Sequence, residues 1–205
     1  MNKKVRSEEL GYLFVVGGPG SSGSSTISVM LANEFSLRRV YGGKILRDIM
    51  SDLGFPSLES AYKEGNMKKV MEIDKKLDEY LIEASKTKNV LIESKVFAGI
   101  AKKQNIPVTV SIWLDASLHV RTMRSLNKLD VTKPFQRIKE YLRIRKDLAY
   151  REKFDRRRYM ELYKVDTAKP ERYYDIVLNT SHMNEEETFK LILKLIKDGG
   201  YIKEE

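Results

Sequence analysis

Residues 13–26 read LFVVGGPGSSGSST, and this stretch decides the fold. Its first four residues are apolar, which predicts a short buried strand that ends at Gly17. Apolar residues at helical spacing follow from Ile27 to Phe35, so the glycine-rich segment joins a strand to a helix. The order strand, glycine loop, helix is typical of the first unit of an α/β protein, which we place at residues 11–35.

The glycine loop has most of the phosphate-binding pattern G-x-x-x-x-G-K-[ST]. Gly18 is followed five residues later by Gly23, and Ser25 offers the hydroxyl that ligates Mg²⁺ in such loops, but Ser24 stands in place of the lysine. Glycines let backbone N–H groups surround a phosphate, and the helix N-terminus adds partial positive charge. A turn capped by Ser24 is the alternative reading. A phosphate loop is favoured, with the binding residues Gly18, Gly20, Ser21, Ser22, Gly23, Ser24, Ser25 and Thr26.

The rest of the chain alternates between predicted strands and helices. Short apolar runs at 90–92, 108–114 and 176–178 predict three more strands. Helical spacing is seen at Val70, Ile73, Leu77, Leu81, Phe189, Ile192, Leu193 and Ile196. Apolar strands separated by helices predict one α/β domain over residues 1–205, with a parallel sheet flanked by helices.

Composition excludes several classes of protein. The chain has no cysteine and two histidines, which excludes a disulfide framework, a thiolate nucleophile and a cluster of Cys or His metal ligands. No apolar run approaches the roughly 20 residues of a membrane span, and the first ten residues are too polar for a signal peptide. We therefore expect a soluble, cytoplasmic, monomeric protein with a disordered arm at residues 1–10. The net charge of +9 implies an anionic partner, and charge alone leaves phosphate ligands, nucleic acid and anionic membranes open.

A basic segment interrupts the alternation. Residues 134–163 contain no glycine, and their one proline, Pro134, fits the first turn of a helix, so they predict a long helix or helix pair. Apolar residues become sparse after Leu148, which predicts a helix that is buried at its start and exposed at its end. A solvated surface helix with pairs such as Glu152 and Arg156 is the alternative to a binding role.

Six pieces of the sequence together resemble the cytidylate kinase family of P-loop nucleoside monophosphate kinases, especially its compact archaeal type. They are the glycine loop and residues 41–47, 90–95, 112–124, 151–166 and 174–181, within a match that runs from about 12 to 197. Residues 41–47 resemble the family's short strand and Gly-x-Ile-x-Arg turn. The resemblance implies a P-loop kinase fold with an acceptor-binding helical region at 41–88 and a basic lid at 134–163. It also implies ATP as phosphoryl donor, Mg²⁺, and a small nucleotide as acceptor.

The resemblance assigns the charged residues. It implies that the acceptor phosphate is held by Arg47 and Lys95, the transferring and donor phosphates by Arg124 and Arg151, and the acceptor nucleoside by Asp155 and Arg158. Guanidinium groups suit these roles because they offer two donors to phosphate oxygens and stay charged when water is expelled. The resemblance also implies that Glu93 holds Mg²⁺ through water, together with Ser25, and an ion pair between Glu93 and Lys95 is the alternative.

Three departures from the family pattern qualify this assignment. Ser24 removes the cation that the loop lysine supplies, so we expect Lys44 or Lys95 to replace it, with Lys44 in a catalytic role. Lys95 replaces the usual arginine, and Glu79 stands near a position where the family commonly has an arginine that reads cytosine.

The sequence thus predicts an enzyme that phosphorylates a nucleoside monophosphate, with CMP or dCMP favoured. A nucleotide-binding protein of the same fold that has lost catalysis is the first alternative, because of Ser24. A nucleic-acid-binding protein that uses the basic helix is the weaker alternative, since few aromatics accompany its arginines and no RNA-binding signature is present.

Overall fold

Five short strands form a fully parallel sheet in the order β2-β3-β1-β4-β5 in the computed structural model, which describes residues 6–56 and 67–202. The strands are β1 (Leu13–Gly17), β2 (Arg38–Tyr41), β3 (Val90–Glu93), β4 (Val110–Asp115) and β5 (Ile176–Asn179). Leu13 pairs with Val90 and Phe14 pairs with Val110, so β1 lies at the centre of the sheet. The predicted parallel α/β sheet is confirmed.

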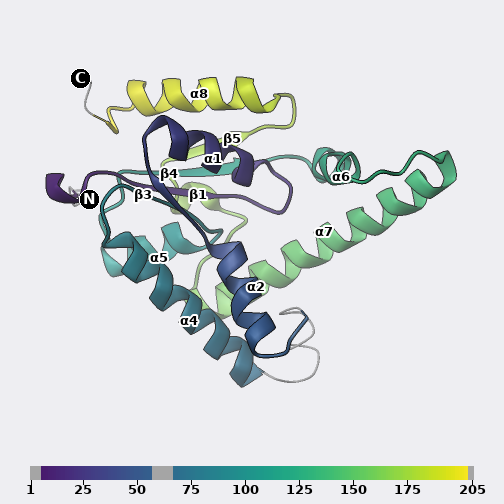
Figure 1. Cartoon of the computed structure of the whole chain (residues 1–205), viewed down its shortest axis with the longest axis horizontal. Helices are drawn as coiled ribbons and strands as arrows, with labels where there is room; N and C mark the ends of the chain where they lie inside the picture. Colours follow the sequence, from purple (N-terminus) through teal and green to yellow (C-terminus); the bar gives the residue numbers. More distant parts are fainter. Residues whose placement is uncertain (1–5, 57–66, 203–205) are drawn as a thin grey trace.

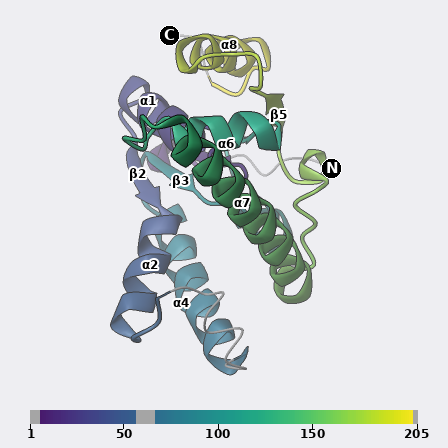
Figure 2. The same ribbon diagram turned by 90° about the vertical axis from the view of Figure 1, so that its right-hand side faces the viewer.

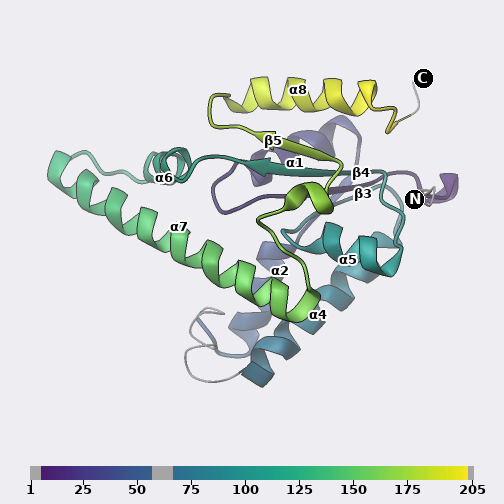
Figure 3. The ribbon, with the colours of Figure 1, turned by 180° about the vertical axis from the view of Figure 1, so that it is seen from behind.

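Helices cover both faces of the sheet and extend beyond it (Figures 1 and 3). They are α1 (Ser24–Glu34), α2 (Gly42–Asp52), α4 (Met67–Ser85), α5 (Phe97–Gln104), α6 (Leu118–Leu126), α7 (Pro134–Tyr163) and α8 (Glu185–Asp198), with 3-10 turns η1 (Glu8–Leu10) and η2 (Pro170–Arg172). Among the helices of the described ranges, none combines the length and apolar character needed to cross a bilayer.

The alternating residues of β1 divide the core into two layers. Phe14 and Val16 pack against α1 and α8, in one cluster with Ile27 and Ile192. Leu13 and Val15 face the opposite side, where α4 and α5 contribute Leu77, Leu81 and Phe97. Strands of this kind are apolar on both faces because helices cover both, which is the pattern that their sequence predicted.

The family-like segment 41–47 folds differently from the expected strand and turn. The strand β2 ends at Tyr41, and Gly42 already begins α2, so Arg47 lies on a helix. Figure 2 shows α2 beside α4, below the sheet, with α7 next to them. Arg47 therefore approaches the carboxyl ends of the strands from a helix, α2, that begins there.

The expectation of a disordered arm is wrong for residues 6–10, while residues 1–5 lie outside the described part of the chain. Arg6 is buried and donates to the carbonyl oxygens of Ser85 (2.8 Å) and Thr87 (2.6 Å). The Ser85 carbonyl belongs to the last residue of α4 and the Thr87 carbonyl lies just beyond it, at the helix end where a positive charge is stabilising. Arg6 thus fixes the start of the chain to that helix end.

The long helix α7 has the predicted bounds, but its predicted burial is reversed. Phe135, Ile138 and Leu142 near its start are exposed, whereas Phe154 and Tyr159 near its end are buried. The first half of α7 projects past the sheet beside α6, and only the second half reaches α2 and α4 (Figure 1). The number of apolar residues does not predict which half of α7 is buried, because neighbouring elements determine which part of a long helix is covered.

Two phenylalanines of α7 make this reversal testable. Phe154 is 9% exposed and packs against Met50 and Ile73, whereas Phe135 is 81% exposed. We expect Phe154→Ala to lower the free energy of unfolding by about 3 kcal/mol. Phe135→Ala, the matched control, should change it by less than about 0.5 kcal/mol. Urea unfolding followed by circular dichroism measures both, and equal losses would contradict the observed burial.

Candidate active site

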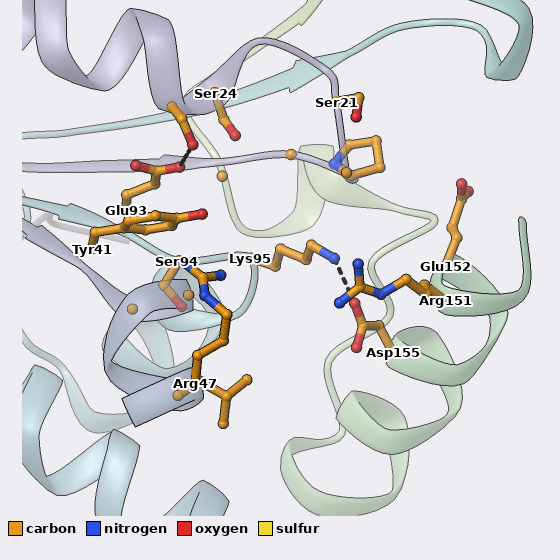
Figure 4. A pocket seen from close by; sticks show the side chains of 18 of the residues that line it. Ser21, Ser24, Tyr41, Arg47, Glu93, Ser94, Lys95, Arg151, Glu152 and Asp155 are labelled. Atoms are coloured by element: carbon orange, nitrogen blue, oxygen red, sulfur yellow. Dashed lines mark hydrogen bonds and ion pairs between the residues drawn. The ribbon is translucent and has the colours of Figure 1, made fainter. Parts of the chain in front are cut away.

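A pocket of about 330 Å³ opens where the carboxyl ends of β1, β2 and β3 meet the second half of α7. Its walls include the glycine loop, the start of α2 with Arg47, and the segment that follows β3 with Lys95. Figure 4 shows Arg47 on one side and Arg151 and Asp155 on the other, with Lys95 extending between them. Polar loops at the carboxyl ends of parallel strands are the usual position of ligand sites in α/β sheets.

The glycine loop has a backbone that other residues would not adopt. Gly23 precedes α1 with φ of 103°, a conformation that side chains with a Cβ rarely take. A Cβ on Gly18 would lie 2.3 Å from the Leu114 carbonyl oxygen. The helix begins at Ser24 and no side-chain hydrogen bond caps it, so the alternative reading of Ser24 as a cap is wrong. The first N–H groups of α1 have no partner within the helix and are available to an anion.

Two arginines of α6 hold the loop from behind. Arg124 donates to the Ser22 carbonyl oxygen (2.8 Å) and to the Thr180 carbonyl oxygen (2.7 Å). Arg121 is buried and donates to Gly20 O (3.4 Å) and to Glu152 of α7 (2.5 Å). The carbonyl oxygens of Gly20 and Ser22 therefore face arginines of α6.

Ser25 and Glu93 meet at the centre of the site. The Ser25 hydroxyl donates to Glu93 Oε1 at 2.5 Å, and the Glu93 side chain is only 7% exposed. The other carboxylate oxygen, Oε2, accepts from Arg39 of β2. Glu93 is thus paired with Arg39 and not with Lys95, so the alternative ion pair is wrong.

The side of the pocket formed by α7 and the segment after β3 is built from paired charges. Lys95 donates to Asp155 Oδ2 at 2.5 Å, and Arg158 donates to Asp155 Oδ1 at 3.1 Å. Burial alone would raise the pKa of Asp155, but the charges of Lys95 and Arg158 outweigh it and hold that pKa below its ordinary value. Arg158 is also bonded to Asp74 of α4, and its guanidinium lies 4.4 Å from the Tyr159 ring centroid. The pocket therefore presents fixed cations and a fixed carboxylate.

A half-buried carboxyl, Asp78, lies one helical turn after the buried Asp74. Burial raises the pKa of Asp78 to about 6, while its hydrogen bond with the Tyr163 hydroxyl opposes the shift. Burial also raises the pKa of Asp74, and the Arg158 charge offsets this only in part. Both carboxyl groups at the contact between α4 and α7 thus have a raised pKa.

The comparisons with known proteins agree with this geometry. A family model described as AAA domain matches residues 16–153. The chain is 32% identical to the cytidylate kinase of Pyrococcus horikoshii over 200 residues, which are 94% of this chain and 95% of that protein. It is 32% identical to the cytidylate kinase of Methanopyrus kandleri, over 89% of this chain and 92% of that protein. The chain belongs to the cytidylate kinase family.

Comparison with solved structures shows that this cytidylate kinase family member has a P-loop kinase fold. The shikimate kinase of Bacteroides thetaiotaomicron superposes with a TM-score of 0.57 at 11% identity, over 91% of this chain and 97% of that one. An uncharacterized protein of Eubacterium ventriosum superposes with a TM-score of 0.63 at 12% identity, over 91% and 98%. At these identities the likeness concerns the fold alone.

The structure brings most of the predicted site residues of this cytidylate kinase family member into one pocket. Those that line it are Gly18, Gly20, Ser21, Ser24, Ser25, Arg47, Glu93, Lys95, Arg151, Asp155 and Arg158. Ser22, Gly23 and Thr26 are not among the lining residues, and Arg124 contacts the loop from outside. Lys44 also lies outside the lining, since its amine binds Asp48 at 2.6 Å and its side chain is 68% exposed.

Other predicted polar contacts have different partners. Glu79 is 63% exposed and lies 3.8 Å from Lys75, away from the pocket lining. Glu152 pairs with Arg121 and not with Arg156, which binds Asp166 at 2.9 Å. The helical spacing that suggested the pair of Glu152 and Arg156 is present, but tertiary partners compete for both side chains.

Sequence reasoning missed three contributors to the site of this cytidylate kinase family member. Arg39 lies just before the segment 41–47 that carried the resemblance, and it binds Glu93. Tyr41 is the first residue of that segment and lines the pocket. Arg121 lies one helical turn before Arg124. The local sequence gives no signal for the two arginines, because Arg39 follows Arg38 and Arg121 lies among other polar residues; their partners Glu93 and Glu152 are distant in sequence.

The raised pKa of Asp78 predicts a pH effect on stability. The folded chain binds this proton more tightly than the unfolded chain, so stability falls as pH rises from about 4 to about 6. Asp78→Asn should therefore stabilise the protein at pH 7 and have little effect at pH 4. Allowing for partial exposure, we expect a difference of about 1 kcal/mol.

Thermal unfolding at both pH values measures this difference. Glu79→Gln on the exposed side of the same helix is the matched control and should leave the pH dependence unchanged. Parallel pH profiles for the unaltered protein and Asp78→Asn would contradict the raised pKa.

Proposed function

We propose that the protein transfers the γ-phosphoryl group of ATP to CMP or dCMP in the presence of Mg²⁺. One observation carries this proposal. A single pocket joins a phosphate loop and the Ser25–Glu93 pair to a second set of cations that includes Arg47 and Lys95. Two anionic ligands are thereby provided for, one at each end of the same cavity. The chain is about 30% identical to the cytidylate kinases named above, and this family membership supports the choice of acceptor.

The residues suit phosphoryl transfer by positioning and charge. An acceptor phosphate oxygen forms the new bond to the γ-phosphorus, the bond to the β–γ bridging oxygen breaks, and ADP leaves. The acceptor oxygen is already anionic, so no general base is needed. Arg47 and Lys95 would hold the acceptor phosphate, and Arg151 would stabilise charge on the transferring group. Arg124 would act on the donor side from α6, through the loop that it contacts.

Mg²⁺ fits the oxygens at Ser25 and Glu93. A hydroxyl and a carboxylate are hard donors, and they lie 2.5 Å apart. Within residues 6–56 and 67–202, no group of three or more His, Cys, Asp or Glu could hold a metal, so nucleotide phosphates would complete its ligands. When bound, Mg²⁺ would neutralise charge on the phosphates. Ser25 and Glu93 would hold it directly or through water.

The acceptor nucleoside would lie against α7. Asp155 and Arg158 line the pocket beside Tyr159, and both are fixed by ion pairs. Residues 41–88 would form the acceptor-binding region, of which 57–66 lie outside the described part of the chain. Residues 134–163 would act as the lid through the face that carries Arg151.

Ser24 favours a second candidate, a nucleotide-binding protein of the same fold without catalysis. The pocket would still bind nucleotides, because its N–H groups and arginines do not depend on residue 24. Transfer would be slow unless another cation replaced the lysine.

A substrate panel distinguishes the two candidates. We expect ADP release from ATP and Mg²⁺ with CMP or dCMP, at least about tenfold faster than with UMP or AMP, in a coupled assay. Thermal stabilisation by nucleotides without turnover of any acceptor would instead support the binding protein. Preference for AMP would contradict the proposed acceptor.

Arg47 should act on the acceptor alone. Arg47→Ala removes a pocket cation, and we expect the KM for CMP to rise by about 10- to 100-fold while the KM for ATP changes little. Arg38→Ala is the matched control, because Arg38 is exposed and binds Thr87 away from the pocket. Equal rises in both KM values for Arg47→Ala would contradict the acceptor role.

A further inference from the structure

The donor end of the pocket lacks the cation that a phosphate loop usually supplies. Ser24 lines the pocket with a neutral hydroxyl where the loop pattern has lysine. Lys44 is bound to Asp48 on an exposed helix face. Lys95 extends to the acceptor side and binds Asp155. Neither lysine therefore lies beside Ser25.

Arg39 shares Glu93 with Ser25, although Arg39 is not among the residues that line the pocket. Its guanidinium binds Glu93 Oε2 through Nε (3.1 Å) and one terminal nitrogen, while Glu93 Oε1 accepts from Ser25. The Glu93 carboxylate thus lies between the Arg39 guanidinium and Ser25, the residue that follows Ser24. The two oxygens of Glu93 face different partners, so Glu93 can bind Ser25 and Arg39 at the same time.

The sheet explains how a residue of β2 reaches the loop. Arg39 pairs with Leu91 and Tyr41 pairs with Glu93, and side chains in register in a parallel sheet point to the same face. Leu91 packs in the cluster that contains α1 residues, so Arg39 lies on the face covered by α1. The glycine loop leads directly into the start of α1. Arg39 therefore runs along the sheet toward the loop from the next-but-one strand.

The contacts leave Arg39 able to bind an additional anion. A guanidinium has five N–H donors in a planar fork, and the contacts with Glu93 involve Nε and one terminal nitrogen. Its side chain is 25% exposed, and it lies 4.7 Å from the centroid of the Tyr41 ring, which lines the pocket. The aromatic ring and the carboxylate fix its position beside Tyr41 and Glu93, two residues that line the pocket.

We propose that Arg39 supplies to the donor phosphates the positive charge that Ser24 does not. The proposal rests on the proposed function in taking a nucleoside triphosphate as the donor ligand. It assigns Arg39 a binding role beyond the neutralisation of Glu93. The structure places the replacement cation on a strand, where it approaches from the sheet and not from the loop.

Binding of the non-hydrolysable analogue adenylyl imidodiphosphate tests the proposal. With Mg²⁺ present, we expect Arg39→Ala to raise the Kd measured by calorimetry by about 10- to 100-fold. Arg39→Lys keeps the charge and should raise it by less than about tenfold. Arg38→Ala, the neighbouring arginine that points away to Thr87, should leave it unchanged. The Kd for CMP should not change in any of these variants.

Restoring the loop cation separates charge supply from structural support. Ser24→Lys in the Arg39→Ala background should recover at least about tenfold of the lost affinity, whereas Ser24→Lys alone should improve it less. A merely structural ion pair between Arg39 and Glu93 predicts a loss of thermal stability and no recovery of affinity by Ser24→Lys. That result, or an unchanged Kd in Arg39→Ala, would overturn the proposal. If Arg39→Ala does not fold, Arg39→Gln is compared in its place, once with Ser24 unaltered and once with Ser24→Lys.

The outcomes also separate this inference from the proposed function. Loss and recovery of analogue binding in a protein without turnover would support Arg39 and contradict the enzyme. Turnover of CMP with an unchanged Kd in Arg39→Ala would support the enzyme and overturn the role of Arg39. Failure of the unaltered protein to bind the analogue would overturn both.

Discussion

The register between β1 and β3 is the constraint on which the site depends. Val16 pairs with Glu93, so the glycine loop leaves the sheet beside the residue that ends β3. The Ser94 N–H donates to the Val16 carbonyl oxygen at 2.9 Å and continues this pairing beyond the strand. A shift by one residue would turn Glu93 to the other face, away from Ser25 and α1. The apolar side chains of both strands resist such a shift, because each face is buried under helices.

Buried charges then connect the helices to this frame. Arg158 of α7 binds Asp74 of α4 and Asp155 of its own helix, and Asp155 in turn binds Lys95. Each charge would be costly to bury alone, and it is compensated only when α4, α7 and the segment after β3 are docked together. The ion pairs thus specify one arrangement of the pocket walls more than they add stability. The same docking sets the distance between the glycine loop and the pocket wall that carries Lys95 and Asp155.

Much of this architecture could be predicted from the sequence, because it follows from local patterns. Four strands and the bounds of α7 were indicated by apolar runs and by Pro134, and the loop by the spacing of Gly18 and Gly23. The burial of α7 could not be predicted, because Phe135 and Phe154 differ in what lies next to them and not in their local sequence. Lys44 shows the same limit for the site, since the helical start of α2 turns its side chain to Asp48.

The absent lysine illustrates why a motif and its chemistry are separable. A phosphate loop needs positive charge near the donor phosphates, and the sequence pattern records only one way to supply it. In this fold the ends of β2 and β3 lie beside the start of α1, so a cation on β2 can serve the same space. Arg39 is two residues before Tyr41, and the period of a strand places both on the face of Glu93. A motif search along the chain cannot detect this arrangement, because the two halves come together only through the pairing of β2 with β3. The charge at a phosphate site is therefore better judged from the sheet as a whole than from the loop alone.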